Sequence, residues 1–247
     1  MTQAVKTATT QMKDVQIRSG PVQLRGDLNI PATAQGVVLF AHGSGSSRHS
    51  PRNQFVARTI REAGVGTLLF DLLTKEEEAV DMHTAHLRFD IGLLAERLIN
   101  ATRWIKSELD YLNVGYFGSS TGGGAALVAA AELGESVGAV VSRGGRPDLA
   151  GDELPRVKSP TLLIVGGLDY PVIEMNEEAL ARMRCEKELK IVPGATHLFE
   201  EPGTLEEVAR LRLIGFKSIC IRLRRNELSQ RKFWIKCLKS GGEERCK

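Results

Sequence analysis

The stretch NVGYFGSSTGGGAAL, residues 113–127, decides the fold that this sequence predicts. Its first part is an apolar run typical of a buried strand, and its last part is compatible with a tightly packed helix. Between them, residues 118–122 (GSSTG) match the pattern G-x-S-x-G. With a strand before it and a helix after it, this pattern predicts a sharp turn that presents Ser120 as a nucleophile.

The glycines do not fit the two common phosphate-binding patterns. A phosphate loop requires G-x-x-x-x-G-K-[ST], and no lysine follows the glycines of residues 118–124. A dinucleotide-binding fingerprint requires G-x-G-x-x-G in the first strand–helix unit, whereas this stretch comes late in the chain. A glycine-rich helix start without any chemistry is the remaining alternative to a nucleophile turn.

Short apolar runs alternate with helical patterns along the chain. The runs GVVLFAHG, VGTLLFD, NVGYFG, VGAVVS and TLLIVGG are typical of strands buried on both faces, and KELKIVPG of a more exposed last strand. VQIRSGPVQLRGDLNIP predicts an antiparallel hairpin at the sheet edge. Helical patterns cover residues 54–63, 91–106, 122–133 and 172–182. The alternation predicts an α/β fold with a mostly parallel sheet and helices on both faces.

The residues that follow each strand are the candidates for chemistry, because such sheets bind ligands at the carboxyl ends of their strands. His197, after the last strand, is the expected base for a serine hydroxyl. Asp169 directly follows TLLIVGG and would orient this base, while Asp71 and Asp148 are the other candidate acids. The order Ser120, Asp169, His197 matches that of the α/β-hydrolases.

Two backbone N–H groups would stabilise the oxyanion that forms when Ser120 attacks a carbonyl group. One is expected from Thr121, directly after the serine. The other is expected from the HGSGSS turn, where Ser44 is preferred over Gly43 and Gly45. A tight turn without a catalytic role is the alternative for HGSGSS.

Arg143 follows the strand VGAVVS and has two alternative roles. It could bind a substrate carboxylate, or it could form an ion pair with Asp148 or Asp152. We retain substrate binding as a prediction.

The remaining histidines are expected to play other parts. His42 is interpreted as structural. His83 and His86 are spaced for one face of a helix in an acidic insertion, where Asp81 or Asp90 could complete a metal site. A solvated, lid-like helix is the preferred interpretation, and no metal or cofactor is expected.

Four segments resemble the dienelactone hydrolase-like family of α/β-hydrolases. They are VVLFAHGSGSSRHSPRN, VGYFGSSTGGGAALVAAAELG, VVSRGGRPDLAGDELPRVKSPTLLIVGG and IVPGATHLFEEPGTLEEVARL, and the resemblance spans residues 15–210. It implies an eight-stranded sheet and hydrolysis through an acyl-enzyme without a cofactor, with Ser120 as nucleophile, Asp169 as acid and His197 as base. The best-known members carry a cysteine nucleophile, so the serine favours a general ester or lactone hydrolase.

Length and composition are those of one medium-sized globular domain. The chain has 247 residues, of which 42% are hydrophobic and 26% charged. No apolar run approaches the length of a membrane span. The polar start lacks the features of a secretory signal, so we expect a cytoplasmic protein with reduced thiols.

The chain is predicted to have three parts: a flexible tail over 1–14, the hydrolase domain over 15–210 and a basic extension over 211–247. The extension contains eleven Lys and Arg residues against three Glu. This abrupt change suggests a shifted reading frame or a fused extension, and its first part could form the helix that closes the sheet.

The expected binding partner is a small ester or lactone substrate. The protein is expected to be a monomer or a homodimer, without membrane contact. The domain itself gives no indication of nucleic-acid binding, although the basic extension leaves this open. Two functions compete with hydrolysis: acyl transfer on the same scaffold, and non-catalytic binding of acidic partners through the extension.

Overall fold

The first two strands form the hairpin predicted from the alternating pattern around Gly20. In the computed structural model, which describes residues 11–216, β1 (Gln11–Ser19) pairs antiparallel with β2 (Val22–Ile30). Gly20 has a φ of 58° at the turn, in the left-handed region that favours glycine. Because β1 begins at Gln11, residues 11–14 belong to the sheet rather than to the flexible tail expected over 1–14.

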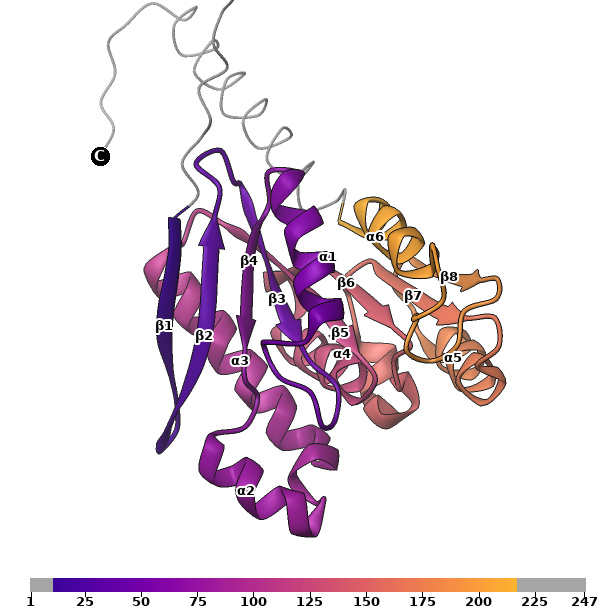
Figure 1. Cartoon of the computed structure of the whole chain (residues 1–247), viewed down its shortest axis with the longest axis horizontal. Coiled ribbons are helices and arrows are strands. Elements are labelled where there is room, and N and C mark those ends of the chain that lie inside the picture. Colours follow the sequence, from indigo (N-terminus) through magenta and orange to yellow (C-terminus); the bar gives the residue numbers. More distant parts are fainter. Residues whose placement is uncertain (1–10, 217–247) are drawn as a thin grey trace, which may run out of the picture.

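Eight strands form one sheet in the order β1-β2-β4-β3-β5-β6-β7-β8 (Figure 1). The remaining strands are β3 (Gly36–Ala41), β4 (Gly66–Phe70), β5 (Asn113–Ser119), β6 (Val137–Arg143), β7 (Thr161–Gly166) and β8 (Lys187–Val192). β2 pairs antiparallel with β4, and all pairs from β4 to β8 are parallel. The predicted mostly parallel sheet with an antiparallel N-terminal edge is confirmed.

Helices cover both faces of the sheet (Figure 1). The main helices are α1 (Pro51–Glu62), α3 (Ile91–Glu108), α4 (Thr121–Leu133), α5 (Tyr170–Arg182) and α6 (Thr204–Gly215). Side chains of α1 and α6 pack into one core, and those of α3, α4 and α5 into the other. Three 3₁₀ segments, η1 (Leu87–Phe89), η2 (Gly134–Ser136) and η3 (Pro147–Arg156), and the short α2 (Lys75–Thr84) lie in the connections.

The two cores follow from the alternation of side chains along the strands. Neighbouring residues of β5 show this, since Tyr116 packs on the α3–α4 side and Phe117 on the α1–α6 side. The ring centres of Phe117 and Phe40 are 5.0 Å apart, and both side chains are buried. The carboxyl ends of the parallel strands are therefore anchored by packing on both faces.

Helix α6 continues past residue 210, where the hydrolase domain was expected to end. Leu211 and Phe216 are buried in the core beside the sheet, so the first residues of the predicted extension take part in the fold. The basic part of the extension lies outside the described residues. Among the helices of residues 11–216, none is long and apolar enough to cross a bilayer.

Candidate active site

Ser120 occupies the sharp turn between β5 and α4. Its φ of 50° and ψ of −125° are unfavourable for a residue with a side chain, and such a conformation costs about 1–3 kcal/mol. The surrounding backbone holds it in place. The N–H groups of Gly123 and Arg146 donate to its carbonyl oxygen at 2.9 and 3.0 Å, and its own N–H donates to Arg143 at 3.4 Å. The turn is therefore fixed by the main chain.

Two glycines allow the backbone to approach this turn closely. A Cβ atom on Gly118 would lie 2.6 Å from the carbonyl oxygen of Gly122. A Cβ atom on Gly122 would lie 2.1 Å from the carbonyl oxygen of Ala41, at the end of β3. Both glycines of the GSSTG pattern are thus required by close packing of backbone on backbone, and not by flexibility.

Asp169 and His197 are joined by a hydrogen bond of 2.6 Å between Oδ2 of the aspartate and Nδ1 of the histidine. Asp169 lies between β7 and α5, and His197 lies in the loop after β8. The two loops are tied together, since the N–H of Leu168 donates to the carbonyl oxygen of Ala195 at 2.9 Å. The side chain of His197 is 38% exposed and that of Asp169 13%, so the acid is shielded while the ring remains accessible.

The other two candidate acids are engaged elsewhere. Asp71 accepts hydrogen bonds from the backbone N–H and the guanidinium of Arg48. Asp148 accepts two hydrogen bonds from the guanidinium of Arg146, at 2.9 and 2.7 Å. Of the three, only Asp169 is hydrogen-bonded to a histidine within residues 11–216.

Gly144 links the surroundings of Ser120 and His197. It follows Arg143, whose carbonyl oxygen accepts the hydrogen bond from the N–H of Ser120. A Cβ atom on Gly144 would lie 3.6 Å from Cε1 and 3.2 Å from the carbonyl oxygen of His197.

The Ser120 hydroxyl makes no hydrogen bond to any residue of 11–216. Hydrogen bonds between a nucleophile and its base often form only when substrate binds.

The predicted oxyanion residues, Ser44 and Thr121, both line a cavity at this edge of the sheet, whereas Ser120 and His197 are not among its lining residues. Within residues 11–216 the backbone N–H groups of both are without a hydrogen-bond acceptor, as expected for Thr121 in the first turn of a helix. Gly43 packs the HGSGSS turn directly against the serine, because a Cβ atom on Gly43 would lie 2.9 Å from the Cβ of Ser120. Both N–H groups are therefore available near the nucleophile turn.

His42 has a structural role, because its ring connects the HGSGSS turn to the residues after β4. Its Nε2 accepts a hydrogen bond from the N–H of Leu72 at 3.0 Å, so the proton is on Nδ1, which donates to the carbonyl oxygen of Gly43 at 3.0 Å. Burial lowers the pKa of His42, which keeps the ring neutral.

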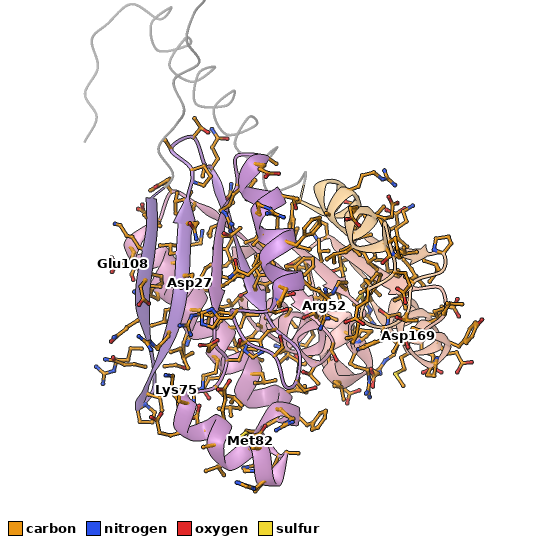
Figure 2. All side chains as sticks on the ribbon, in the orientation of Figure 1. Asp27, Arg52, Lys75, Met82, Glu108 and Asp169 are labelled. Carbon is orange, nitrogen blue, oxygen red and sulfur yellow. The ribbon has the colours of Figure 1, made fainter. Side chains whose placement is uncertain are left out.

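The cavity has a volume of about 590 Å³, within the range of small-molecule sites. Besides the HGSGSS turn and Thr121, it is lined by Leu72 and Leu73 after β4 and by residues of α2. Figure 2 shows the labelled Met82 on α2, beyond the strand ends, and Asp169 on the β7 side of the sheet. The sequence indicated a lid-like helix in this acidic insertion, but it did not single out Glu78, which also lines the cavity.

Arg143 forms neither of the ion pairs considered from the sequence. Asp148 pairs with Arg146 at 2.7 Å, and Asp152 pairs with Arg182 at 2.9 Å. The alternative of an ion pair at Arg143 is therefore wrong.

Arg143 is instead buried beside an aromatic ring. Its guanidinium carbon lies 5.9 Å from the centre of the Phe199 ring, and its Nε and Nη1 have no hydrogen-bond partner among the described residues. Burial, and then repulsion by Arg52, lower the pKa of Arg143 to about 10. The side chain does not line the cavity described above, and its contact with substrate stays a prediction.

The H-x-x-H pair does not lie on one helix face. Helix α2 ends at Thr84, and Ala85 has a φ of 55°, so His86 falls outside the helix that carries His83. Of the two proposed additional ligands, Asp81 is hydrogen-bonded to Arg88 and Asp90 accepts a hydrogen bond from the N–H of Leu93. Within residues 11–216, no group of three or more His, Cys, Asp or Glu side chains is arranged for a metal ion.

Comparison with known proteins agrees with this fold. A sequence model described as the dienelactone hydrolase family matches residues 24–212. The crystal structure of dienelactone hydrolase from Anabaena variabilis is 61% identical, with a TM-score of 0.82 over 84% of this chain and 97% of that chain. Est1E from Butyrivibrio proteoclasticus, solved with bound ferulic acid, is 18% identical with a TM-score of 0.70, over 83% of this chain and 99% of that chain. This last likeness concerns the fold alone.

Two curated proteins from strains of Mycobacterium tuberculosis are each 59% identical to this chain over 201 residues. Both carry the provisional name phosphoribosyl transferase. The alignment covers 81% of this chain but 44% of each relative, so the chain spans less than half of their length. The matched family model and the close structural relative together show that the chain belongs to the dienelactone hydrolase family, within the α/β-hydrolase superfamily.

Proposed function

We propose that this protein is a serine hydrolase that cleaves small carboxylic esters or lactones through an acyl-enzyme. The observation that carries the proposal is the 2.6 Å hydrogen bond between Asp169 and His197, at the edge of the sheet where the strained turn of Ser120 also lies. Membership of a hydrolase family supports the same reaction class.

In the proposed mechanism, Oγ of Ser120 attacks the carbonyl carbon while Nε2 of His197 takes the hydroxyl proton. Asp169 accepts the Nδ1–H hydrogen bond, which fixes the tautomer and stabilises the imidazolium. The N–H groups of Thr121 and Ser44 donate to the oxyanion. His197 then returns the proton to the leaving alkoxide, and the attack of water on the acyl-enzyme, with the same base, releases the acid.

The proposal is tested with a panel of short acyl esters, lactones and amides, together with a fluorophosphonate probe. We expect turnover of esters or lactones and a single covalent adduct on Ser120. Absence of turnover across the panel, or an adduct on another residue, would refute the assignment.

Acyl transfer is distinguished from hydrolysis in the same assay. Acyl transfer would use the same acyl-enzyme with an alcohol in place of water, and added alcohols would then divert the product to a new ester. We infer that the transferase named in the mycobacterial relatives resides in the part of them that this chain does not span, because the hydrolase family match covers residues 24–212 here. Binding of acidic partners depends on the basic extension, most of which lies outside the described residues.

Replacing Asp169 by Asn is expected to lower kcat by about 10⁴-fold, because the amide no longer fixes the productive tautomer of His197. Steady-state kinetics with the best ester of the panel measures this. Asp148→Asn removes the same charge at another of the candidate acids, and we expect its kcat to stay within about twofold of the wild type. Equal losses in the two variants would contradict the role of Asp169.

Gly144→Ala is expected to lower kcat by up to about 10²-fold, because the added Cβ would lie 3.2 Å from the carbonyl oxygen of His197 and the backbone that carries the proposed base must shift to make room. Gly194→Ala is the matched control: its φ of 73° is also positive, but nothing lies within 4 Å of the added atom. Both variants carry the backbone cost of a positive φ, whereas only Gly144→Ala displaces the base. A kcat that is equally reduced in both would show that backbone strain, and not the position of His197, is responsible.

A further inference from the structure

Glu78 is a carboxylate on the cavity wall that forms no hydrogen bond or ion pair within residues 11–216. It lies on α2 and is half-buried, and it shares the cavity with the oxyanion residues Ser44 and Thr121. A carboxylate that has lost part of its hydration without gaining a partner is unfavourable, unless a ligand supplies the missing interaction.

The other charged side chains of the lining are neutralised by partners. Nε of Arg88 lies 2.5 Å from Oδ2 of Asp81, and Nη1 of Arg52 lies 2.8 Å from Oε1 of Glu200. The lining holds two arginines and two acids, but Arg52 is paired with Glu200 outside the lining, so Glu78 is the charged side chain of the lining that is left without an ion-pair partner among the described residues.

The surroundings of Glu78 disfavour its negative charge, so that a cation bound beside it would be stabilising. Burial and the nearby Asp71 raise the pKa of its carboxyl group, with a further contribution from Asp81, against opposing effects of Arg48 and Lys75. A carboxylate in such surroundings is stabilised by an added cation and destabilised by an added anion. The charge of a substrate therefore affects how tightly it binds beside Glu78, before any chemistry takes place.

The cavity wall also has apolar side chains that can contact an aliphatic segment of a substrate. Leu72, Leu73, Leu94 and Met82 line the same cavity, and Met82 is 71% exposed. We propose that Glu78 makes the cavity selective for esters that carry a positively charged group on a short apolar arm, and that it disfavours esters that carry a carboxylate. This inference rests on the proposed hydrolase function, and it assigns that site a substrate class.

Esters matched in shape but different in charge test the proposal. One series consists of nitrophenyl esters of trimethylammoniobutyrate, of its uncharged tert-butyl isostere, and of glutarate as the monoester. A second series places the charge on the alcohol, with the acetate esters of choline and of its dimethylbutyl isostere. In at least one series we expect kcat/KM to favour the cation over the neutral isostere by roughly fivefold, the scale of one partly exposed ion pair.

Glu78→Gln removes the charge and keeps the shape of the side chain. We expect the preference for the cation to fall to about one, and the relative kcat/KM of the glutarate monoester to rise by roughly fivefold. Glu96→Gln is the matched control, because Glu96 is an exposed acid on α3 that does not line the cavity. It removes the same formal charge and should retain the preference of the wild type.

Equal kcat/KM for all charge states in both series would overturn the proposal, and so would equal effects of Glu78→Gln and Glu96→Gln. Binding separates this outcome from a failure of the proposed reaction. Calorimetric affinities of the cationic ester and its neutral isostere from each series, measured in Ser120→Ala, do not depend on turnover. If the wild type hydrolyses no ester, a preference for the cation that is lost in Ser120→Ala/Glu78→Gln still supports the inference, and no preference rejects it.

Discussion

Replacing Ser120 by Ala is expected to lower kcat for ester hydrolysis by about 10⁵–10⁶-fold, the effect of removing the nucleophile of a catalytic triad. In the proposed mechanism the hydroxyl oxygen forms the acyl-enzyme, and neither His197 nor the proposed oxyanion N–H groups can replace it. The loss should appear in kcat at saturating substrate. Labelling by the fluorophosphonate probe should be lost with it.

Ser119→Ala is the control for this variant, since it removes the adjacent hydroxyl of the GSSTG pattern. Ser119 is the last residue of β5 and is buried, and we expect its replacement to change kcat by less than about tenfold. Residual labelling in Ser120→Ala, or comparable losses in the two variants, would show that the nucleophile is misassigned.

Gly122→Ala is expected to lower the free energy of unfolding by about 3 kcal/mol or more, which is exceptional for the addition of one methyl group. The added carbon would lie 2.1 Å from the carbonyl oxygen of Ala41 and 2.6 Å from that of His42. Both are backbone atoms, and Ala41 is paired with Gly118 in the centre of the sheet, so they cannot move aside as a side chain would. Urea unfolding followed by circular dichroism measures the change.

Gly92→Ala provides the comparison, because Gly92 is exposed near the start of α3 and the nearest atom to an added Cβ is 3.4 Å away. Alanine is favoured over glycine in a helix, so the free energy of unfolding should rise by up to about 1 kcal/mol. A loss in Gly122→Ala no larger than about 1 kcal/mol would mean that β3 and α4 are less tightly apposed than the structure shows.

The parts of the site that could be predicted from the sequence are those that depend on local order along the chain. Ser120, Asp169 and His197 each follow a recognisable strand, and a parallel sheet brings such positions to one edge. The structure places all three there and adds the hydrogen bond between Asp169 and His197. Their catalytic roles stay predictions until the variants are measured.

The remaining features depend on contacts between distant segments, which no local pattern encodes. Glu78 reaches the cavity because α2 folds back toward the HGSGSS turn. His83 and His86 are separated because Ala85 ends α2 in a left-handed conformation, a position where glycine is the usual signal. The burial of Arg143 beside Phe199 likewise depends on the loop after β8, which is distant in sequence.

The close approaches at Gly118 and Gly122 involve only main-chain atoms, and none of them depends on the side chain at position 120. Gly43 contacts Ser120 at Cβ, before the reactive atom. The geometry of the turn and the chemical identity of the predicted nucleophile, Ser120, are therefore separable. An exchange of oxygen for sulfur at this position would alter the reactivity of the family while leaving the architecture that presents it intact, so one scaffold can supply both serine and cysteine enzymes during evolution.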